Sequence, residues 1–262
     1  MNETERQHHI VEALKKHPFS TVKDLMAVVD ASAATIRRDI LKLHAAGAVR
    51  KVFGGIASID GLSSRNRLSA RPFDERLATA VDEKKAIAAE AEKLCRDGDS
   101  VIISGGSTCH LLAQRLTTRS LKIYTNSMPV STVLSEKGLC QLVVAGGELH
   151  RESGILYSQL PDALPFYASR CFIGTQGIGP DGAMESHPML IQSIQRLIKM
   201  SDELVLLADS RKFSIRARHI AVPLSRIATL ITDDRISESD VRMMENEGVS
   251  VVTTSVMTSF TP

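Results

Sequence analysis

The sequence predicts a two-part α/β protein, with a small helical N-terminal domain and a larger domain built on a mainly parallel sheet. Helical patterns and a short basic hairpin fill the first sixty residues. From Glu83 onward, helix-like segments alternate with apolar runs, which is typical of a parallel sheet covered by helices. The segment between them is rich in Ser and Arg, which is typical of a linker. We therefore predict domains at 1–59 and 77–262, joined by a linker at 60–76.

Composition and charge narrow the class of protein. The sequence has no run of about 18 apolar residues, and its N-terminus lacks a signal-peptide pattern, so we expect a cytoplasmic protein without a membrane partner. The four cysteines are scattered without metal-binding spacing, which predicts buried thiols and no metal or other cofactor. Residues 1–76 carry 13 Lys/Arg against 9 Asp/Glu, or +4, whereas the whole chain carries +2. A basic N-terminal part favours an anionic polymer as its partner.

Three helices are expected at the start of the chain. The first spans residues 5–15. Thr21, followed by Asp24 at the third position after it, predicts the capped start of a second helix. Ser32 is expected to cap a third helix over residues 33–46. Two short helices joined by a tight turn form a helix-turn-helix.

The third helix has the features of a recognition helix. Ile36, Ile40 and Leu43 form a narrow apolar stripe, while Arg38 and Lys42 project to the opposite side. In a helix-turn-helix this second face enters the major groove, where arginine can pair with guanine and lysine more often contacts phosphate. A charged face that is merely solvated is the alternative, and the capped helix before it and the hairpin after it favour DNA binding.

A basic hairpin follows the third helix. Residues 49–57 predict two short strands around a Gly54-Gly55 turn, with Arg50 and Lys51 on the first strand. Such a hairpin behind a recognition helix forms a wing, so the sequence predicts a winged helix-turn-helix. The predicted DNA-binding residues are Ser32, Ala34, Thr35, Arg37, Arg38, Lys42, Arg50 and Lys51.

The Thr-Ile-Arg-Arg-Asp run at residues 35–39, together with this hairpin, resembles the DNA-binding signature of the DeoR family of bacterial regulators. The resemblance implies a winged helix-turn-helix with operator contacts from Thr35, Arg37 and Arg38. Asp39 is expected to hold an arginine in a salt bridge rather than to contact a base, because a carboxylate facing phosphate is repelled.

In the larger domain, small and polar residues follow the apolar strands. Residues 104–108 (Ser-Gly-Gly-Ser-Thr) follow the first strand and begin a helix, an arrangement whose amides and helix N-terminus suit an oxyanion. Each glycine pair alone would be an ordinary turn, but several such loops share the strand ends, where parallel sheets bind ligands. No nucleotide-binding glycine motif is present. The predicted effector-binding residues are Ser104, Gly105, Gly106, Ser107, Thr108, Asn126, Gly146, Gly147, Glu148, Gln176 and Lys212.

These loops resemble the sensor domain of DeoR-type regulators, whose fold is similar to that of ribose-5-phosphate isomerase. The resemblance implies phosphate binding at residues 106–108, pocket contacts from Asn126 and Gly147, and a positive charge from Lys212. Ser104 stands where many members have an aspartate, and residues 188–194 are apolar where an acidic residue and a lysine are frequent. The identity of the effector therefore stays open.

The sequence thus predicts a DNA-binding transcriptional regulator that is not an enzyme. The resemblance implies a repressor of a carbohydrate catabolic operon, with double-stranded operator DNA and a small phosphorylated sugar or sugar-acid effector as partners. A homodimer or homotetramer is expected, because one short recognition helix contacts few base pairs.

Two alternatives stay open. A sugar-phosphate isomerase with an appended DNA-binding head would need a carboxylate base, for which Glu148 and Asp209 are candidates and Ser104 removes one position. A DNA-binding scaffold whose larger domain binds nothing is the other.

Overall fold

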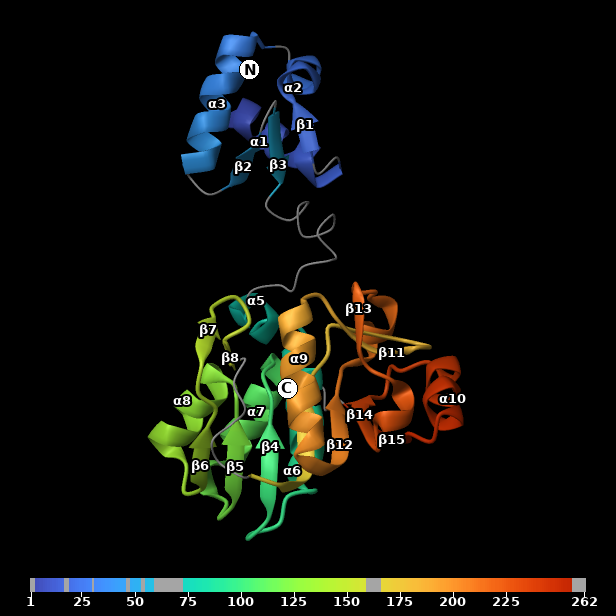
Figure 1. Ribbon diagram of the computed structural model, residues 1–262. Coiled ribbons are helices and arrows are strands. Elements are labelled where there is room, and N and C mark those ends of the chain that lie inside the picture. The colour runs from blue at the N-terminus through green and yellow to red at the C-terminus, as the bar shows by residue number, and fades with distance from the viewer. Residues whose placement is uncertain are drawn as a thin grey trace, which may run out of the picture. The chain divides into compact units, whose positions relative to one another are not determined.

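The computed structural model describes residues 3–16, 19–29, 31–45, 48–52, 55–58, 73–158 and 166–255. The chain divides into two compact units, Met1–Arg67 and Leu68–Pro262, which are coloured from blue to red along the chain in Figure 1. The division falls inside the predicted linker. Residues 60–72 of that linker lie outside the described residues, so the predicted domain limits stay predictions.

The described part of the first unit combines three helices with a three-stranded antiparallel sheet. The helices are α1 (Glu3–Lys16), α2 (Val22–Val29) and α3 (Ala33–Ala45). The strands are β1 (Phe19–Thr21), β2 (Val49–Val52) and β3 (Gly55–Ser58), in the order β1-β3-β2. The helices and the β2–β3 wing confirm the prediction. Strand β1 was not predicted, because three residues between two helices show no periodicity and only the pairing with β3 makes them a strand.

Capping signals fix where the helices of this unit begin. The Asp24 backbone N–H donates to Thr21 Oγ1 (3.2 Å) and the Thr21 backbone N–H donates to Asp24 Oδ2 (2.9 Å), a reciprocal capping box. Ser32 Oγ accepts the Thr35 backbone N–H at 3.3 Å and so caps α3 as predicted. The core of the unit includes Ile10, Leu14, Leu25, Ile36 and Ile56, each at most 1% exposed.

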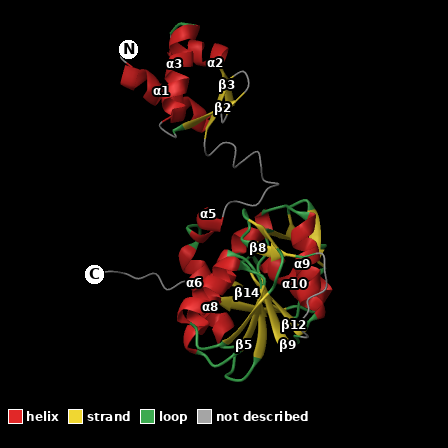
Figure 2. Ribbon diagram, turned by 60° about the vertical axis from the view of Figure 1, so that its left-hand side comes forward, coloured by secondary structure: helices red, strands yellow, loops and turns green. Residues whose placement is uncertain are grey.

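A seven-stranded parallel sheet forms the centre of the second unit, as Figure 2 shows. Its order is β15-β14-β12-β9-β4-β5-β6, and every neighbouring pair is parallel. The predicted α/β domain with a mainly parallel sheet is therefore confirmed. The strands are β4 (Ser100–Ile103), β5 (Lys122–Thr125), β6 (Gln141–Val144), β9 (Ala168–Ile173), β12 (Ser201–Leu207), β14 (Thr229–Asp233) and β15 (Ser250–Thr254).

Helices cover both faces of this sheet. They are α5 (Phe73–Leu77), α6 (Val81–Glu92), α7 (Ser107–Arg115), α8 (Met128–Lys137), α9 (Pro188–Lys199) and α10 (Glu238–Asn246), with 3-10 turns η1 (Leu116–Thr118), η2 (Ser210–Ser214) and η3 (Leu224–Arg226). Helix α9 packs on one face, in front of the sheet in Figure 1, and α6, α7 and α8 pack on the other. Helix α5 was not predicted, since a five-residue helix is too short to show a pattern.

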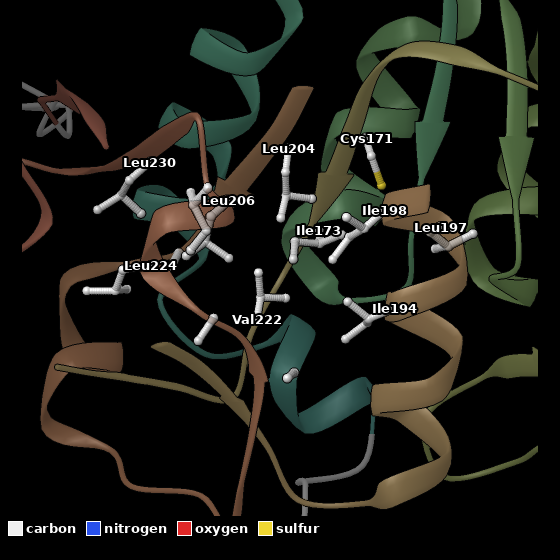
Figure 3. Packing of buried hydrophobic residues seen from close by; sticks show 14 of the residues in the cluster. Cys171, Ile173, Ile194, Leu197, Ile198, Leu204, Leu206, Val222, Leu224 and Leu230 are labelled. Carbon is white, nitrogen blue, oxygen red and sulfur yellow. The ribbon is translucent and has the colours of Figure 1, made fainter. Parts of the chain in front are cut away.

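Alternating strand residues build two cores. Ile173 and Leu206 lie on the face of the sheet that α9 covers, in one cluster with Ile194 and Ile198 of that helix, as seen in Figure 3. Their neighbours along the strands, such as Phe172, point to the opposite face and pack with α6 and α7. Burying one such side chain stabilises a fold by about 1.5–3 kcal/mol. The sheet is thus held from both sides, and its strand ends are fixed in place.

Two small antiparallel elements were not predicted. Strands β7 (Glu148–His150) and β8 (Ile155–Tyr157) form a hairpin, and β10 (Gly177–Gly179), β11 (Gly182–Glu185) and β13 (His219–Val222) form a separate sheet. Figure 1 shows both at the same end of the second unit as α5. Strands of three or four glycine-rich or mixed residues resemble loops in the sequence, which is why they were missed.

The remaining general expectations concern membranes and thiols. Among the helices described here, none is long and apolar enough to cross a membrane. Cys95, Cys109 and Cys171 are free and buried, as predicted, and burial raises the pKa of the Cys95 and Cys109 thiols to about 12. Cys140 is free but only partly buried, so the prediction was wrong for that thiol.

Candidate DNA-binding surface and effector site

The predicted recognition helix α3 presents a basic surface. Ile36 and Ile40 are buried under the helix, while Arg37, Arg38 and Lys42 are exposed on it. Neither Arg37 nor Arg38 has an ion-pair partner among the described residues. Both guanidinium groups are therefore available to an anionic or hydrogen-bonding partner such as DNA.

Asp39 is the carboxylate that holds α3 in the first unit. It is 1% exposed and accepts hydrogen bonds from Arg6 Nε (2.5 Å) and Arg6 Nη2 (3.2 Å). The expectation that Asp39 pairs with an arginine is confirmed, and the arginine comes from α1 rather than from α3. This pair joins α3 to α1 and keeps the Asp39 carboxylate buried, away from the exposed face of α3.

Lys42 has a partner that DNA would have to displace. Its Nζ lies 2.6 Å from Glu3 Oε1, with both side chains about half exposed. The hydrogen bond from Lys42 lowers the pKa of Glu3. Exposed pairs of this kind contribute about 0–1 kcal/mol, so exchange of Glu3 for a phosphate costs little.

The other predicted DNA-binding residues lie at the start of α3 and on the wing. Ser32 and Ala34 are exposed, and Thr35 is half-buried with its hydroxyl 2.9 Å from Ser32 Oγ. Arg50 and Lys51 occupy the middle of β2, opposite Ala57 and Ile56 of β3. The structure thus places the predicted set on α3, on its cap and on the wing.

In the second unit, the loop after β4 begins the candidate effector site. Ser104 is buried, and its N–H donates to the Phe172 carbonyl of the neighbouring strand at 2.9 Å. Gly106 precedes the first residue of α7, and Ser107 and Thr108 form the buried first turn of that helix. A Cβ at Gly106 would lie 4.0 Å from Gly174 Cα, so the loops after β4 and β9 are adjacent.

The β7–β8 hairpin covers the loop after β4. A Cβ added to Gly105 would lie 2.1 Å from Ile155 Cδ1, so Ile155 rests directly on this glycine. The Leu156 N–H donates to the Asn126 carbonyl at 2.7 Å, which ties the hairpin to the end of β5. Asn126 Nδ2 donates to Ser193 Oγ of α9 at 2.7 Å, and Asn126 is 3% exposed.

Three predicted residues lie where the chain enters this hairpin. Gly146 has open space around it, whereas Gly147 has a φ of +128° and packs against the Tyr157 carbonyl. Glu148 begins β7 with an exposed side chain. The structure therefore assigns Gly147 a packing role and gives Glu148 no contact with the buried polar groups described below.

Charged residues gather after β9 and β12. Lys212 Nζ, in η2, lies 3.5 Å from the Gln176 carbonyl. Burial of Lys212 lowers its pKa, against the opposing charges of Asp209 and Glu185. Burial alone would raise the pKa of Asp209, but the hydrogen bond from Arg211 and the charges of Lys212 and Lys84 outweigh it and lower that pKa. Asp209 is therefore an ionised acceptor, paired on Oδ1 with Arg211 at 2.7 Å.

Sequence reasoning missed three charged residues of the site. Lys84 of α6 is 3% exposed, donates to the Arg76 and Thr79 carbonyls, and has its pKa lowered to about 8 by burial. Burial also lowers the pKa of Arg76 in α5. The pKa of Glu185 in β11 is raised by burial to about 7, even with Lys212 and Arg76 nearby. The signal for Lys84 and Arg76 was absent because both precede the first strand of the sheet.

Unsatisfied polar atoms mark the same region. Six buried side-chain N or O atoms of the described residues lack a hydrogen-bond partner, and five of them belong to this site. Each such atom costs about 1–3 kcal/mol when it has no partner. The five are Arg76 Nε and Nη2, Asn126 Oδ1, Gln176 Oε1 and Asp209 Oδ2. Two donors and three acceptors together suit a ligand with an anionic group and several hydroxyls.

Comparison with known families agrees with this division of the chain. Residues 6–61 match the DeoR-like helix-turn-helix domain, and residues 79–234 match the DeoR C terminal sensor domain. The second match alone spans more than half of the chain. The chain belongs to the DeoR family.

Curated relatives of this DeoR-family protein are named as transcriptional regulators. The chain is 29% identical over 253 residues to the HTH-type transcriptional regulator UlaR of Shigella dysenteriae serotype 1, and the match covers 96% of this chain and 99% of that protein. The UlaR of Salmonella newport matches with the same identity and coverage. This DeoR-family chain is a DNA-binding transcriptional regulator and not an enzyme, as predicted.

Solved structures similar to part of this chain include two proteins of other kinds. Ribose 5-phosphate isomerase A of Methanocaldococcus jannaschii covers 50% of this chain and 53% of its own, at 17% identity and a TM-score of 0.37. The translation initiation factor eIF-2B of Pyrococcus horikoshii covers 79% and 66%, at 17% identity and the same TM-score. Membership of the DeoR family rests on the two domain matches and not on these structures.

Proposed function

We propose that this regulator is a repressor of a carbohydrate catabolic operon, and that a phosphorylated sugar or sugar acid changes its affinity for operator DNA. The observation that carries the proposal is the set of five unsatisfied buried atoms at the strand ends. An anionic group would lie near Lys212 and accept from the buried N–H donors of this set. Sugar hydroxyls would donate to Asn126 Oδ1, Gln176 Oε1 and Asp209 Oδ2.

The proposed DNA contacts follow the exposed face of α3 and the wing. Arg37 and Arg38 would contact base edges, with Thr35, and Lys42 would leave Glu3 for a phosphate. Strand β2 of the wing would lie along the phosphate backbone of the DNA. The full proposed DNA-binding set is Ser32, Ala34, Thr35, Arg37, Arg38, Lys42, Arg50 and Lys51.

The DNA part of the proposal is tested with a duplex selected from a random library by the purified chain. We expect Arg38→Ala to weaken specific binding by about 1–3 kcal/mol, because one bidentate base contact contributes that much. Arg242→Ala removes an exposed positive charge from α10 of the other unit and serves as the control. Fluorescence anisotropy titrations measure both variants. Equal affinities of Arg38→Ala and the control would argue against α3 as the recognition helix.

The effector part is tested by thermal shift of the full chain against ribose 5-phosphate, 6-phosphogluconate and inorganic phosphate. We expect a phosphorylated sugar or sugar acid to raise the melting temperature of the wild type and not of Lys212→Ala. If neither sugar phosphate raises the melting temperature of the wild type, the result would argue for a second domain that binds no such ligand. Turnover of ribose 5-phosphate would argue for an isomerase.

Assembly and location complete the proposal. We propose a homodimer or homotetramer that acts in the cytoplasm, because one recognition helix contacts few base pairs and symmetric half-sites multiply affinity. Light scattering coupled to gel filtration measures the assembly, and a monomer that binds its operator with full affinity would contradict it.

A further inference from the structure

The side chain of Arg76 occupies an unusual environment for an arginine. Its Nε and Nη2 atoms are buried, and no described residue accepts a hydrogen bond from either. No carboxylate of the described residues lies within ion-pair distance of it, although Glu185 and Glu152 are near enough to favour its charge. Burying charged N–H donors that have no acceptor is expensive. A folded protein retains such a group when something else pairs with it.

The position of Arg76 points toward the effector loop. Helix α5 packs on α7, where the Phe73 ring meets the His110 ring edge-on with centroids 5.5 Å apart. The Arg76 guanidinium carbon lies 5.8 Å from the centre of the Phe73 ring, which holds it against this contact. The Lys84 ammonium group donates to the backbone carbonyl of Arg76 and so fixes the backbone at that residue. The side chain is thus positioned beside the helix whose first turn carries Ser107 and Thr108.

Helix α5 is also the first described helix after the segment that leads from the DNA-binding unit. Strand β3 of that unit ends at Ser58, and the chain next enters a described helix at Phe73. A ligand held by α5 therefore acts on the end of the connecting segment itself. The other site residues lie later in the chain, such as Asn126 after β5 and Lys212 in η2.

We propose that Arg76 binds the anionic group of the effector directly, and thereby ties the effector to the chain segment that leads to the DNA-binding unit. This inference rests on the proposed effector site and names the residue that holds its anion. The planar guanidinium fork matches two oxygens of a phosphate or carboxylate. Binding would give Nε and Nη2 the acceptors that the protein does not supply.

The test compares Arg76→Met with Arg170→Met in the full-length chain. Arg170 is a partnered arginine, since it donates to the Leu94 carbonyl at 3.0 Å and pairs with Glu203 at 3.0 Å. Without ligand, we expect Arg76→Met to melt at or above the wild-type temperature, because a buried unpaired charge is replaced by an apolar chain. Arg170→Met is expected to melt lower. A merely structural Arg76 predicts a loss of stability in both variants.

Ligand binding gives the second readout. With ribose 5-phosphate or 6-phosphogluconate as the probe, Arg76→Met is expected to bind roughly 10- to 100-fold more weakly than the wild type, as loss of a charge-assisted contact predicts. Arg76→Lys, which keeps the charge but not the fork, is expected to lie between them, and Arg170→Met to bind like the wild type. DNA affinity of Arg76→Met should equal that of the wild type without probe and should not respond to probe.

The outcomes separate this inference from the function it rests on. Wild-type binding that Lys212→Ala abolishes and Arg76→Met leaves unchanged would overturn the role of Arg76 alone. A wild type that binds neither sugar phosphate would overturn both proposals. A lower melting temperature of Arg76→Met together with an unchanged response to the probe would make Arg76 a structural residue and overturn the inference.

Discussion

Replacement of Gly147 by alanine should detach the β7–β8 hairpin from the second unit, while the same change at Gly146 should not. The two glycines are neighbours between β6 and β7, and each change adds one methyl group. A Cβ at Gly147 would lie 2.2 Å from the Tyr157 carbonyl oxygen and 2.6 Å from its carbon, whereas nothing lies within 4 Å of a Cβ at Gly146. The pair is therefore a matched test of one contact.

The expected cost at Gly147 has two parts. The φ of +128° is rare for residues with a side chain, and such strain costs about 1–3 kcal/mol. The overlap with Tyr157 adds about 1–3 kcal/mol, because the obstacle is backbone of the paired strand and cannot rotate away. The sum of about 2–6 kcal/mol is large for a hairpin of two three-residue strands. Local opening of the hairpin is therefore expected before unfolding of the sheet.

Hydrogen exchange of the amides at residues 148–157 measures this opening, and the response to 6-phosphogluconate or ribose 5-phosphate measures its consequence. Gly147→Ala should exchange faster in the hairpin and lose the response, because Ile155 no longer covers Gly105. Gly146→Ala should stay within about 0.5 kcal/mol of the wild type. A weaker probe response of Gly146→Ala with unchanged exchange would place that glycine at the ligand. Equal exchange rates in the two variants would refute the steric argument.

Two further predictions concern buried charges. Arg6→Met leaves Asp39, 2% exposed at its side chain, without its charged partner, so the first unit should unfold at a clearly lower urea concentration and lose DNA binding, while the melting of the second unit stays unchanged. Lys42→Met breaks the exposed pair with Glu3 and should shift the urea midpoint much less. Equal shifts in the two variants would contradict the buried-pair argument. Burial raises the pKa of Glu185 to about 7, so the folded state holds its proton more tightly than the unfolded state and stability is lost as pH rises from about 4.3 to 7. Glu185→Gln should remove that loss, so the variant should be more stable than the wild type by about 1–3 kcal/mol above pH 7 and equally stable below about pH 4. The range is reduced because Glu185 is only partly buried. A difference between the thermal melts that does not change with pH would exclude the titration.

The first unit could be predicted almost completely from the sequence because its signals are local. Thr21 with Asp24, and Ser32 with Thr35, act over three residues, and the stripe from Ile36 to Leu43 is one helical period repeated. The partner of Asp39 could be predicted only as an arginine. Its identity depends on the packing of α1 against α3, which no local pattern specifies.

The effector site could be predicted only in part, for a reason of topology. A residue at the end of a parallel strand can be located from the sequence, which is how Asn126, Gln176 and Lys212 became candidate site residues. Arg76 and Glu185 reach the site from a short helix before the sheet and from an antiparallel strand outside it. Neither element has enough residues for a periodic pattern. The sequence therefore shows the charges of Arg76 and Glu185 but does not predict where these two side chains lie.

Coupling between effector binding and DNA binding requires only a small part of the free energy that the effector site can gain from a ligand. A change of about 1–3 kcal/mol in operator affinity suffices for a 5- to 150-fold response. Each of the five unsatisfied atoms contributes an amount of the same size when it gains a partner. A ligand shifts a regulator between two states only by the difference in its affinity for those states. A contact therefore couples effector to DNA only where its strength differs between the DNA-bound and free states. Arg76, on the helix that follows the connecting segment, is the member of the set placed to do so.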